Sequence, residues 1–242
     1  MTEPYVFSTS KYTVALYGPQ PSIIKARELA VVHGANPDRI CAIKAASNAT
    51  CRGFKEIQAP NFGSMAKNDF DNYADGVTLT KPGDSAILWT AGCPSDAMLE
   101  HSTNTLLFTH SGRPALTPKN DLGEPINNII TLAYQQLVFG VKNPQVEAFI
   151  AGCVCPEHFR HDKLEAQPLI TPFDQIGEVA FTNRIKGTLD LKRIIIWQLL
   201  EAGVLPQNIH HDGLCTAETP WLTDYRTSKN KEARNVVIAV LH

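Results

Sequence analysis

The sequence predicts an α+β fold in which a core of mixed β-sheet is covered by helices. Strand-type and helix-type hydrophobic patterns alternate along all 242 residues, but they do not form regular strand–helix–strand repeats. The chain contains no internal repeat, no low-complexity tract and no Pro/Gly-rich linker. We therefore expect one domain over residues 1–242 and not a simple doubly wound sheet.

Three segments have the apolar spacing of an amphipathic helix, and six have the composition of strands. The predicted helices are residues 21–33, 127–139 and 190–202, and the predicted strands are residues 39–45, 76–80, 84–90, 106–110, 146–151 and 236–241. Gly203 directly follows the last helix, where a glycine commonly ends one. The polar stretch 47–72 is predicted to be a long loop, which in a domain of this size is often functional.

Composition excludes several classes of protein. Hydrophobic residues make up 43% and charged residues 19% of the chain, and the formal net charge is −2. This balance favours neither nucleic acid nor an anionic membrane as a partner. Because no secretory signal or membrane-length apolar run is visible, we expect a cytoplasmic protein whose six cysteines are reduced thiols.

The strongest chemical signal is a cysteine and a histidine that each follow an apolar strand. The strand 84–90 leads through small residues to Cys93, and the strand 106–110 ends on His110. If these strands are neighbours, they bring a thiol and an imidazole together. Such a pair is either two metal ligands or a nucleophile with its base. The structural alternative is that Cys93 packs as a small hydrophobe and His110 lies at the surface.

A second group of candidates follows the strand 146–151. Cys153 and Cys155 are separated by one residue, which is too close for the usual zinc knuckle, and His158 and His161 come next. A metal site is one interpretation, but a strand end with two thiols on opposite sides of the chain is favoured. The sequence has no phosphate-binding glycine loop, nucleophile elbow or dinucleotide motif.

Taken in order, several motifs resemble a known family. They are Ala74-Asp75-Gly76, Ala91-Gly92-Cys93-Pro94, His110-Ser111-Gly112, the segment 152–159, Asp190-Leu191, Gly203-Val204, Cys215-Thr216 and Tyr225-Arg226. They resemble the motifs of the bacterial laccase-domain family, also described as polyphenol oxidase, purine nucleoside phosphorylase-like or peptidoglycan-editing proteins. The resemblance implies an α/β/β/α sandwich of mixed sheets, like that of cytotoxic-necrotizing-factor-type cysteine hydrolases.

The resemblance also implies a metal centre, usually zinc, held by two histidines and a cysteine. On this basis Cys93 and His110 are the expected catalytic residues and metal ligands. Ser47 stands where the family has its first ligand histidine, and a serine hydroxyl is a poor zinc ligand. His101 is one residue that could take its place.

Other departures from the family pattern add to the prediction of a degenerate active site. Gly92 replaces an aspartate, Arg113 and Pro114 replace a Trp-Arg pair, and Ser10 replaces an arginine. Three further residues are assigned to substrate binding: Arg113, Arg226 and Cys215.

Three functions are consistent with these residues. The first is a zinc-dependent phosphorylase or deaminase acting on a small molecule, such as a purine nucleoside. The second is a thiol hydrolase or amidase in which His110 deprotonates Cys93, with Ser47 orienting the imidazole or binding an oxyanion. The third is a non-catalytic relative that binds a small molecule. A copper centre is not favoured, because the His-x-His pairs expected for it are absent.

Overall fold

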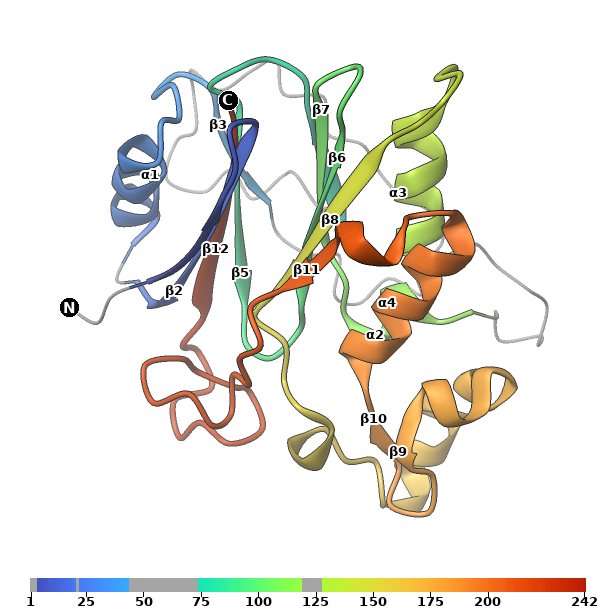
Figure 1. Ribbon diagram of the computed structural model, residues 1–242. Helices are drawn as coiled ribbons and strands as arrows, with labels where there is room; N and C mark the ends of the chain where they lie inside the picture. The colour runs from blue at the N-terminus through green and yellow to red at the C-terminus, as the bar shows by residue number, and fades with distance from the viewer. Residues whose placement is uncertain (1–3, 21, 44–73, 119–127) are drawn as a thin grey trace.

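Two five-stranded sheets face each other in the computed structural model, which describes residues 4–20, 22–43, 74–118 and 128–242 (Figure 1). The first sheet has the strand order β1 (Tyr5–Ser8), β2 (Tyr12–Pro19), β12 (Asn235–Leu241), β5 (Ser85–Thr90) and β3 (Ile40–Ile43). The second sheet has the order β11 (Ile209–His211), β8 (Val146–Ala151), β6 (Ser95–Glu100), β7 (Thr105–His110) and β4 (Gly76–Leu79). Both sheets are mixed, because β3 pairs with β5 and β11 with β8 in parallel, while the other pairs are antiparallel.

Helices cover the outer face of each sheet. Helix α1 (Ile23–Val32) packs on the first sheet, and α2 (Arg113–Leu116), α3 (Ile129–Val138) and α4 (Leu191–Ala202) pack on the second (Figure 1). A third apolar cluster fills the space between the two sheets. The predicted α/β/β/α layering and the α+β class are therefore confirmed.

Strand β12 shows how one strand supports two layers. Val237, Ala239 and Leu241 face the second sheet, whereas Val236 and Ile238 lie under α1. Successive side chains of a strand point to opposite faces, so a strand buried on both sides reads as a continuous apolar run. This is why residues 236–241 are recognised as a strand from sequence.

The predicted helices are confirmed, with ends set by capping residues. The side chains of Ser22, Asn128 and Asp190 each accept a hydrogen bond from the backbone of the first turn of α1, α3 and α4. Gly203 ends α4 with a φ of +107°, a conformation that glycine adopts without a steric penalty.

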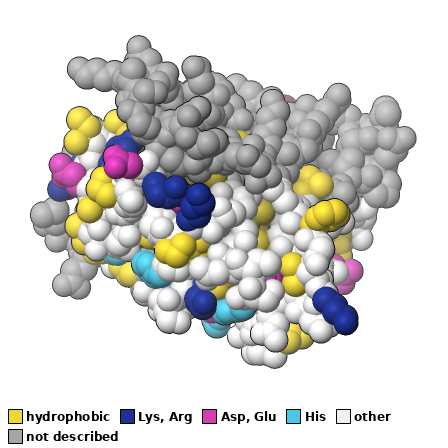
Figure 2. Space-filling view, turned by 90° about the horizontal axis from the view of Figure 1, so that it is seen from above, with side chains coloured by type: hydrophobic (Ala, Val, Ile, Leu, Met, Phe, Trp, Pro, Cys, Tyr) yellow, Lys and Arg dark blue, Asp and Glu magenta, His cyan; other side chains and the backbone are white. Residues whose placement is uncertain are grey.

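The remaining elements lie beside the second sheet. They are the strand pair β9 (Phe181–Asn183) and β10 (Thr188–Leu189) and the 3₁₀ segments η2 (Pro156–His158), η3 (Leu164–Leu169), η4 (Thr171–Val179) and η5 (Pro206–Asn208). Among the described residues, no helix combines the length and apolar character needed to cross a bilayer. On the face shown in Figure 2, charged, histidine and hydrophobic side chains lie interspersed.

Two expectations about strand arrangement need correction. The expected neighbours 84–90 and 106–110 correspond to β5 and β7, which belong to different sheets. Strand β6, which was not predicted, follows β5 in the chain and pairs with β7. The predicted loop 47–72 lies outside the described residues.

Candidate active site

Cys93 lies in the short link that carries the chain from β5 in the first sheet to β6 in the second. Two distant segments hold this link in place. The backbone N–H of Val154 donates to the carbonyl of Gly92 at 3.0 Å, and that of Tyr225 donates to the carbonyl of Ala91 at 3.0 Å. The thiol therefore sits on a backbone that is fixed from both sides.

Gly92 is required at its position for two reasons. Its φ is +108°, which side chains on L-residues rarely allow. A Cβ atom built there would also overlap the carboxylate of Asp224. The Asp224 carboxylate in turn accepts hydrogen bonds from the Arg226 backbone N–H at 2.8 Å and the Thr216 hydroxyl at 3.2 Å.

His110 ends β7 and is held by the residue that precedes β4. Its backbone N–H donates to the carbonyl of Asp75 at 2.8 Å, and its Nδ1 lies 3.6 Å from Oδ1 of the same aspartate. Both residues are buried, at 8% and 6% exposure. Opposite His110 in β6 is Ser95, two residues after Cys93.

The structure brings Cys93 and His110 together beside Gly112. A Cβ atom built on Gly112 would lie 2.9 Å from Cε1 of His110 and 3.4 Å from Sγ of Cys93. The thiol and the imidazole thus both lie next to Gly112, and the absence of a side chain on this glycine leaves space for them. The thiol comes from the link between the two sheets, and the imidazole comes from the end of β7 in the second sheet.

Charge at the site centres on His110. Burial alone would lower the pKa of its imidazole, but the Asp75 carboxylate and the Cys93 thiol outweigh burial and raise the pKa to about 10. The imidazole is therefore protonated at neutral pH and interacts with a sulfur atom and a carboxylate.

Two arginines and a second histidine lie next to this pair. Nη1 of Arg113 is 3.0 Å and Nη2 of Arg226 is 3.1 Å from Nε2 of His161. Nδ1 of His161 lies 3.2 Å from the Gly187 carbonyl. His161 therefore donates a hydrogen bond from Nδ1 to the Gly187 carbonyl and accepts hydrogen bonds from both guanidinium groups at Nε2, which requires a neutral ring.

The electrostatics agree with that assignment. Burial and the charges of Arg226 and Arg113 lower the pKa of His161 to about 4. Burial also lowers the pKa of each arginine, while the charge of Cys93 acts in the opposite direction on both. The guanidinium group of Arg226 stacks 4.3 Å over the ring of Phe159. Two positive groups thus share one neutral acceptor within electrostatic reach of Cys93.

The other residues predicted from sequence have different surroundings. Ser47 lies outside the described residues. Cys215 groups with Cys155 and not with Cys93 and His110. The imidazole of His101 pairs with Glu147, at the opposite end of β6 from Cys93, so it does not take the place of a ligand histidine. Ser10 lies in the turn between β1 and β2.

Sequence reasoning did not select Asp75 and His161 for this site. Asp75 belongs to one of the family motifs, and the feature that could have identified it is an acidic residue directly before a buried strand. His161 belongs to the second candidate group in the sequence, but nothing local links it to this site, because its partners Arg113 and Arg226 are 48 and 65 residues away.

A metal ion does not fit the donor set that the described residues offer here. Zinc needs four ligands, of which at least three come from the protein, and multicopper centres need several histidines. The described ranges contain one group of three or more close metal-binding side chains, and it lies elsewhere, at Cys155. Cys93 and His110 provide two donors, and the carboxylate of Asp75 is turned to His110.

The fold is shared with three solved structures of low sequence identity. They are the hypothetical protein YfiH from Bacillus licheniformis (14% identity, TM-score 0.72, 96% of this chain and 93% of that one), YlmD from Geobacillus stearothermophilus (16%, 0.73, 96% and 91%) and protein NMB0706 from Neisseria meningitidis (12%, 0.70, 99% and 99%). No curated protein matches the sequence.

A family model described as "multi-copper polyphenol oxidoreductase laccase" matches residues 24–242, which is nearly the whole chain. This match agrees with the resemblance seen in the ordered motifs and with the shared fold. The chain belongs to this laccase-like polyphenol oxidoreductase family.

Proposed function

We propose that this chain is a cysteine hydrolase that cleaves an acyl or amide bond in a small substrate carrying an anionic group. The observation that supports it is that the His110 imidazole interacts with the Cys93 thiol on one side and with the Asp75 carboxylate on the other. A nucleophile, a base within reach of it and a third group that orients the base are the parts that covalent hydrolysis requires.

In the first half of the proposed reaction, His110 holds the proton of Cys93 and the sulfur attacks the carbonyl carbon of the substrate. A C–S bond forms while the carbonyl π bond opens, and the resulting oxyanion then collapses. The C–N or C–O bond breaks, and His110 gives its proton to the departing amine or alcohol. The product at this stage is a thioester on Cys93.

In the second half, His110 accepts a proton from water, and the water oxygen attacks the thioester carbon. Collapse of this intermediate breaks the C–S bond, releases the acid and returns the proton to the Cys93–His110 pair. Asp75 keeps Nδ1 of His110 oriented throughout, so it acts as a positioning residue.

The guanidinium groups of Arg113 and Arg226 define the proposed substrate class. Both already donate to the neutral His161, and arginine has further N–H groups for a carboxylate or phosphate. A negative charge there would also offset the repulsion between the two guanidinium groups. We therefore expect substrates with an anionic group near the scissile bond.

The first test is the rate of alkylation by iodoacetamide at each cysteine, followed by mass spectrometry of the peptides. Cys93 should react at least about tenfold faster than the buried Cys41, whose pKa burial raises to about 12. His110→Ala should slow the reaction at Cys93 and leave Cys41 unchanged. Equal rates at both cysteines would overturn the proposal.

The second test uses chromogenic esters and amides with and without a free carboxylate. Turnover should disappear in Cys93→Ala, and Arg226→Ala should raise KM about tenfold for the carboxylate substrates with less effect on the neutral ones. Turnover that survives Cys93→Ala would exclude the thiol as the nucleophile.

Phosphorolysis of a purine nucleoside is a second candidate, and the same arginine pair favours it because phosphate is also an anion. Inosine and adenosine, each with and without phosphate, distinguish the two. The hydrolase proposal expects no phosphate-dependent release of base. Release that requires both phosphate and Cys93 would favour the second candidate.

A further inference from the structure

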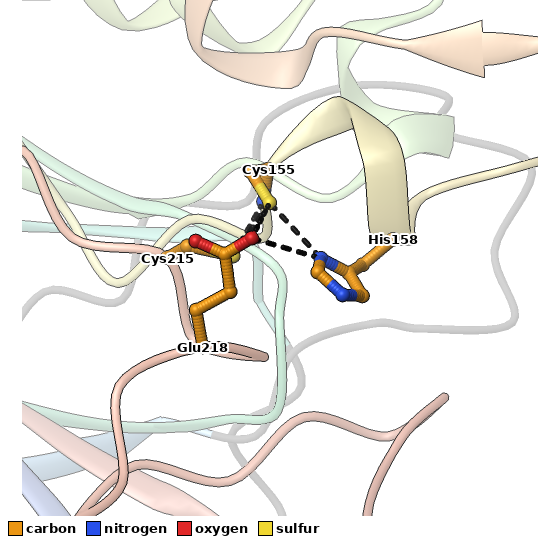
Figure 3. A group of neighbouring side chains, drawn as sticks. All are labelled: Cys155, His158, Cys215 and Glu218. Atoms are coloured by element: carbon orange, nitrogen blue, oxygen red, sulfur yellow. Dashed lines mark hydrogen bonds and ion pairs between the residues drawn. The ribbon is translucent and has the colours of Figure 1, made fainter.

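A second group of chemically active side chains is built around Cys155 and Cys215 and does not include Cys93. Four of them, Cys155, His158, Cys215 and Glu218, place one ligand atom each within 4.8 Å of all the others. Figure 3 shows the four side chains pointing toward a common centre. We infer that this group is a structural zinc site that joins two distant segments of the chain.

Each segment contributes two ligands with two residues between them. The first pair, Cys155 and His158, spans the 3₁₀ turn η2, in which the His158 N–H donates to the Cys155 carbonyl at 3.1 Å. In the second pair, the Glu218 N–H donates to the Cys215 carbonyl at 3.2 Å. Residues three apart in such a turn project to the same side. The spacing is that of a zinc knuckle, with histidine and glutamate replacing the second thiol of each pair.

The distances between ligand atoms are close to those around one small cation. Sγ of Cys155 lies 3.1 Å from Nδ1 of His158, 3.6 Å from Oε1 of Glu218 and 2.8 Å from Sγ of Cys215. Nδ1 of His158 and Oε1 of Glu218 are 3.6 Å apart. Tetrahedral zinc with bonds of 2.0–2.3 Å separates its ligands by roughly 3.3–3.8 Å, so the two sulfurs, which are 2.8 Å apart, must separate by about 1 Å to share one ion.

Charge and ligand type select the metal. Two thiols, an imidazole and a carboxylate suit zinc better than the oxygen-preferring magnesium or calcium. The backbone N–H of Cys155 also donates to Sγ of Cys215 at 3.2 Å, as outer contacts to zinc thiolates do.

Four protein ligands leave no open position, which is the pattern of a structural rather than a catalytic zinc. Glu218 is the exposed member and Cys215 the buried one, so the carboxylate should be the ligand that exchanges most easily. The two segments continue to His161 and Arg226, whose side chains contact each other. The ion would therefore fix the distance between His161 and Arg226. The importance of that distance for catalysis rests on the proposed function, but the metal site itself does not rest on it.

The test is metal content by mass spectrometry in protein reduced with a phosphine, loaded with zinc and freed of excess ion. About one zinc per chain is expected, and Cys155→Ser or Cys215→Ser should reduce this to less than about a tenth. Glu218→Gln should keep the ion but weaken binding about tenfold. Circular dichroism checks that each variant is folded. If a cysteine variant does not fold, the zinc affinity of Glu218→Gln still tests the site.

Two matched controls separate this inference from the function proposed above. Cys41→Ala removes a buried thiol outside the group and should retain the zinc. Cys93→Ala should also retain it while abolishing hydrolysis. Cobalt loading should produce sulfur-to-metal charge-transfer absorption that is lost in Cys155→Ser but not in Cys93→Ala.

Two results would overturn the inference. One is a reduced protein that takes up no zinc, whether or not Cys155 and Cys215 formed a disulfide before reduction. The other is zinc that depends on Cys93 but not on Cys155. Neither result depends on whether the chain hydrolyses a substrate.

Discussion

Asp75 and His110 are joined twice: the backbone N–H of His110 donates to the carbonyl of Asp75, and the Asp75 carboxylate lies 3.6 Å from Nδ1 of the imidazole. Asp75 directly precedes β4, and His110 ends β7, so the first contact extends the antiparallel pairing of these strands and places the carboxylate beside the ring. A residue that acts by orienting a catalytic group is most effective on a rigid element, and Asp75 is next to a strand of the sheet.

The Asp75→Asn variant tests this positioning role. The asparagine keeps the size of the side chain but removes its charge, so the pKa of His110 should fall from about 10. We expect turnover to fall by about 10²- to 10⁴-fold and the alkaline limb of the pH–rate profile to move to lower pH. Asp96 also faces His110 and is unchanged in the variant, so the difference between profiles reports Asp75. A lower rate with an unshifted profile would assign Asp75 a purely structural role.

Gly112→Ala tests the space beside the thiol and imidazole. Its Cβ would lie 2.9 Å from Cε1 of His110, which is too close, so the ring must move. Displacement of a catalytic group by about 1 Å can reduce turnover about 10²-fold, and we expect a loss of that order in kcat with the fold retained. The comparison is Gly140→Ala, which meets no atom within 4 Å but carries a positive φ. That control should lower the melting temperature slightly and leave kcat unchanged, and equal kcat in both variants would contradict the steric argument.

His161 predicts how stability changes in acid. Its pKa is about 4 in the folded chain and near 6.5 when unfolded, so the unfolded state binds the proton more readily. The stability from neutral His161 is fully present above pH 6.5 and is lost as the pH falls toward 4. Allowing for solvent screening at the exposed Arg226, we expect a loss of about 1–2 kcal/mol.

His161→Gln provides the matched measurement. Glutamine offers an oxygen to Arg113 and Arg226 but does not titrate in this range. Urea unfolding at pH 7 and pH 4.5 should show a larger loss of unfolding free energy in the original chain than in the variant. Equal losses would mean that folding does not lower the pKa of His161.

Six of the twelve described strands and three of the four described α-helices could be predicted from sequence, because apolar runs and caps mark these elements. Strand β6 escaped prediction because buried polar groups interrupt its pattern: Ser95, Asp96 and Glu100 are all fully buried. Glu100 is stabilised there by hydrogen bonds from Ser102 and Thr103 in the following turn. Those partners become visible only when the turn is folded.

The candidate site was predictable only in part, because its residues come from the link between the sheets, from the end of β7 and from segments far apart in the sequence. Cys93 and His110 could be selected from their positions after apolar strands, but which sheet each strand joins is a long-range property. Cys155 and His158 have the spacing of a pair of zinc ligands in the sequence. The nearer pair, Cys153 and Cys155, is too close for a zinc knuckle and therefore argued against a metal site in this segment. Cys153 is buried in the core against the second sheet and does not join the group.

Gly92→Ala tests why the residue before the thiol is a glycine. Two costs act together, since the backbone has a φ of +108° and the new methyl group would overlap the carboxylate of Asp224. Strain of the backbone alone should cost about 1–3 kcal/mol, and the overlap should add to it. Adding Asp224→Ala removes the overlap but not the strain, so unfolding in urea should show that the double variant is less destabilised than the sum of the two single changes. If the two changes were simply additive, Asp224 would not be the group that keeps position 92 free of a side chain.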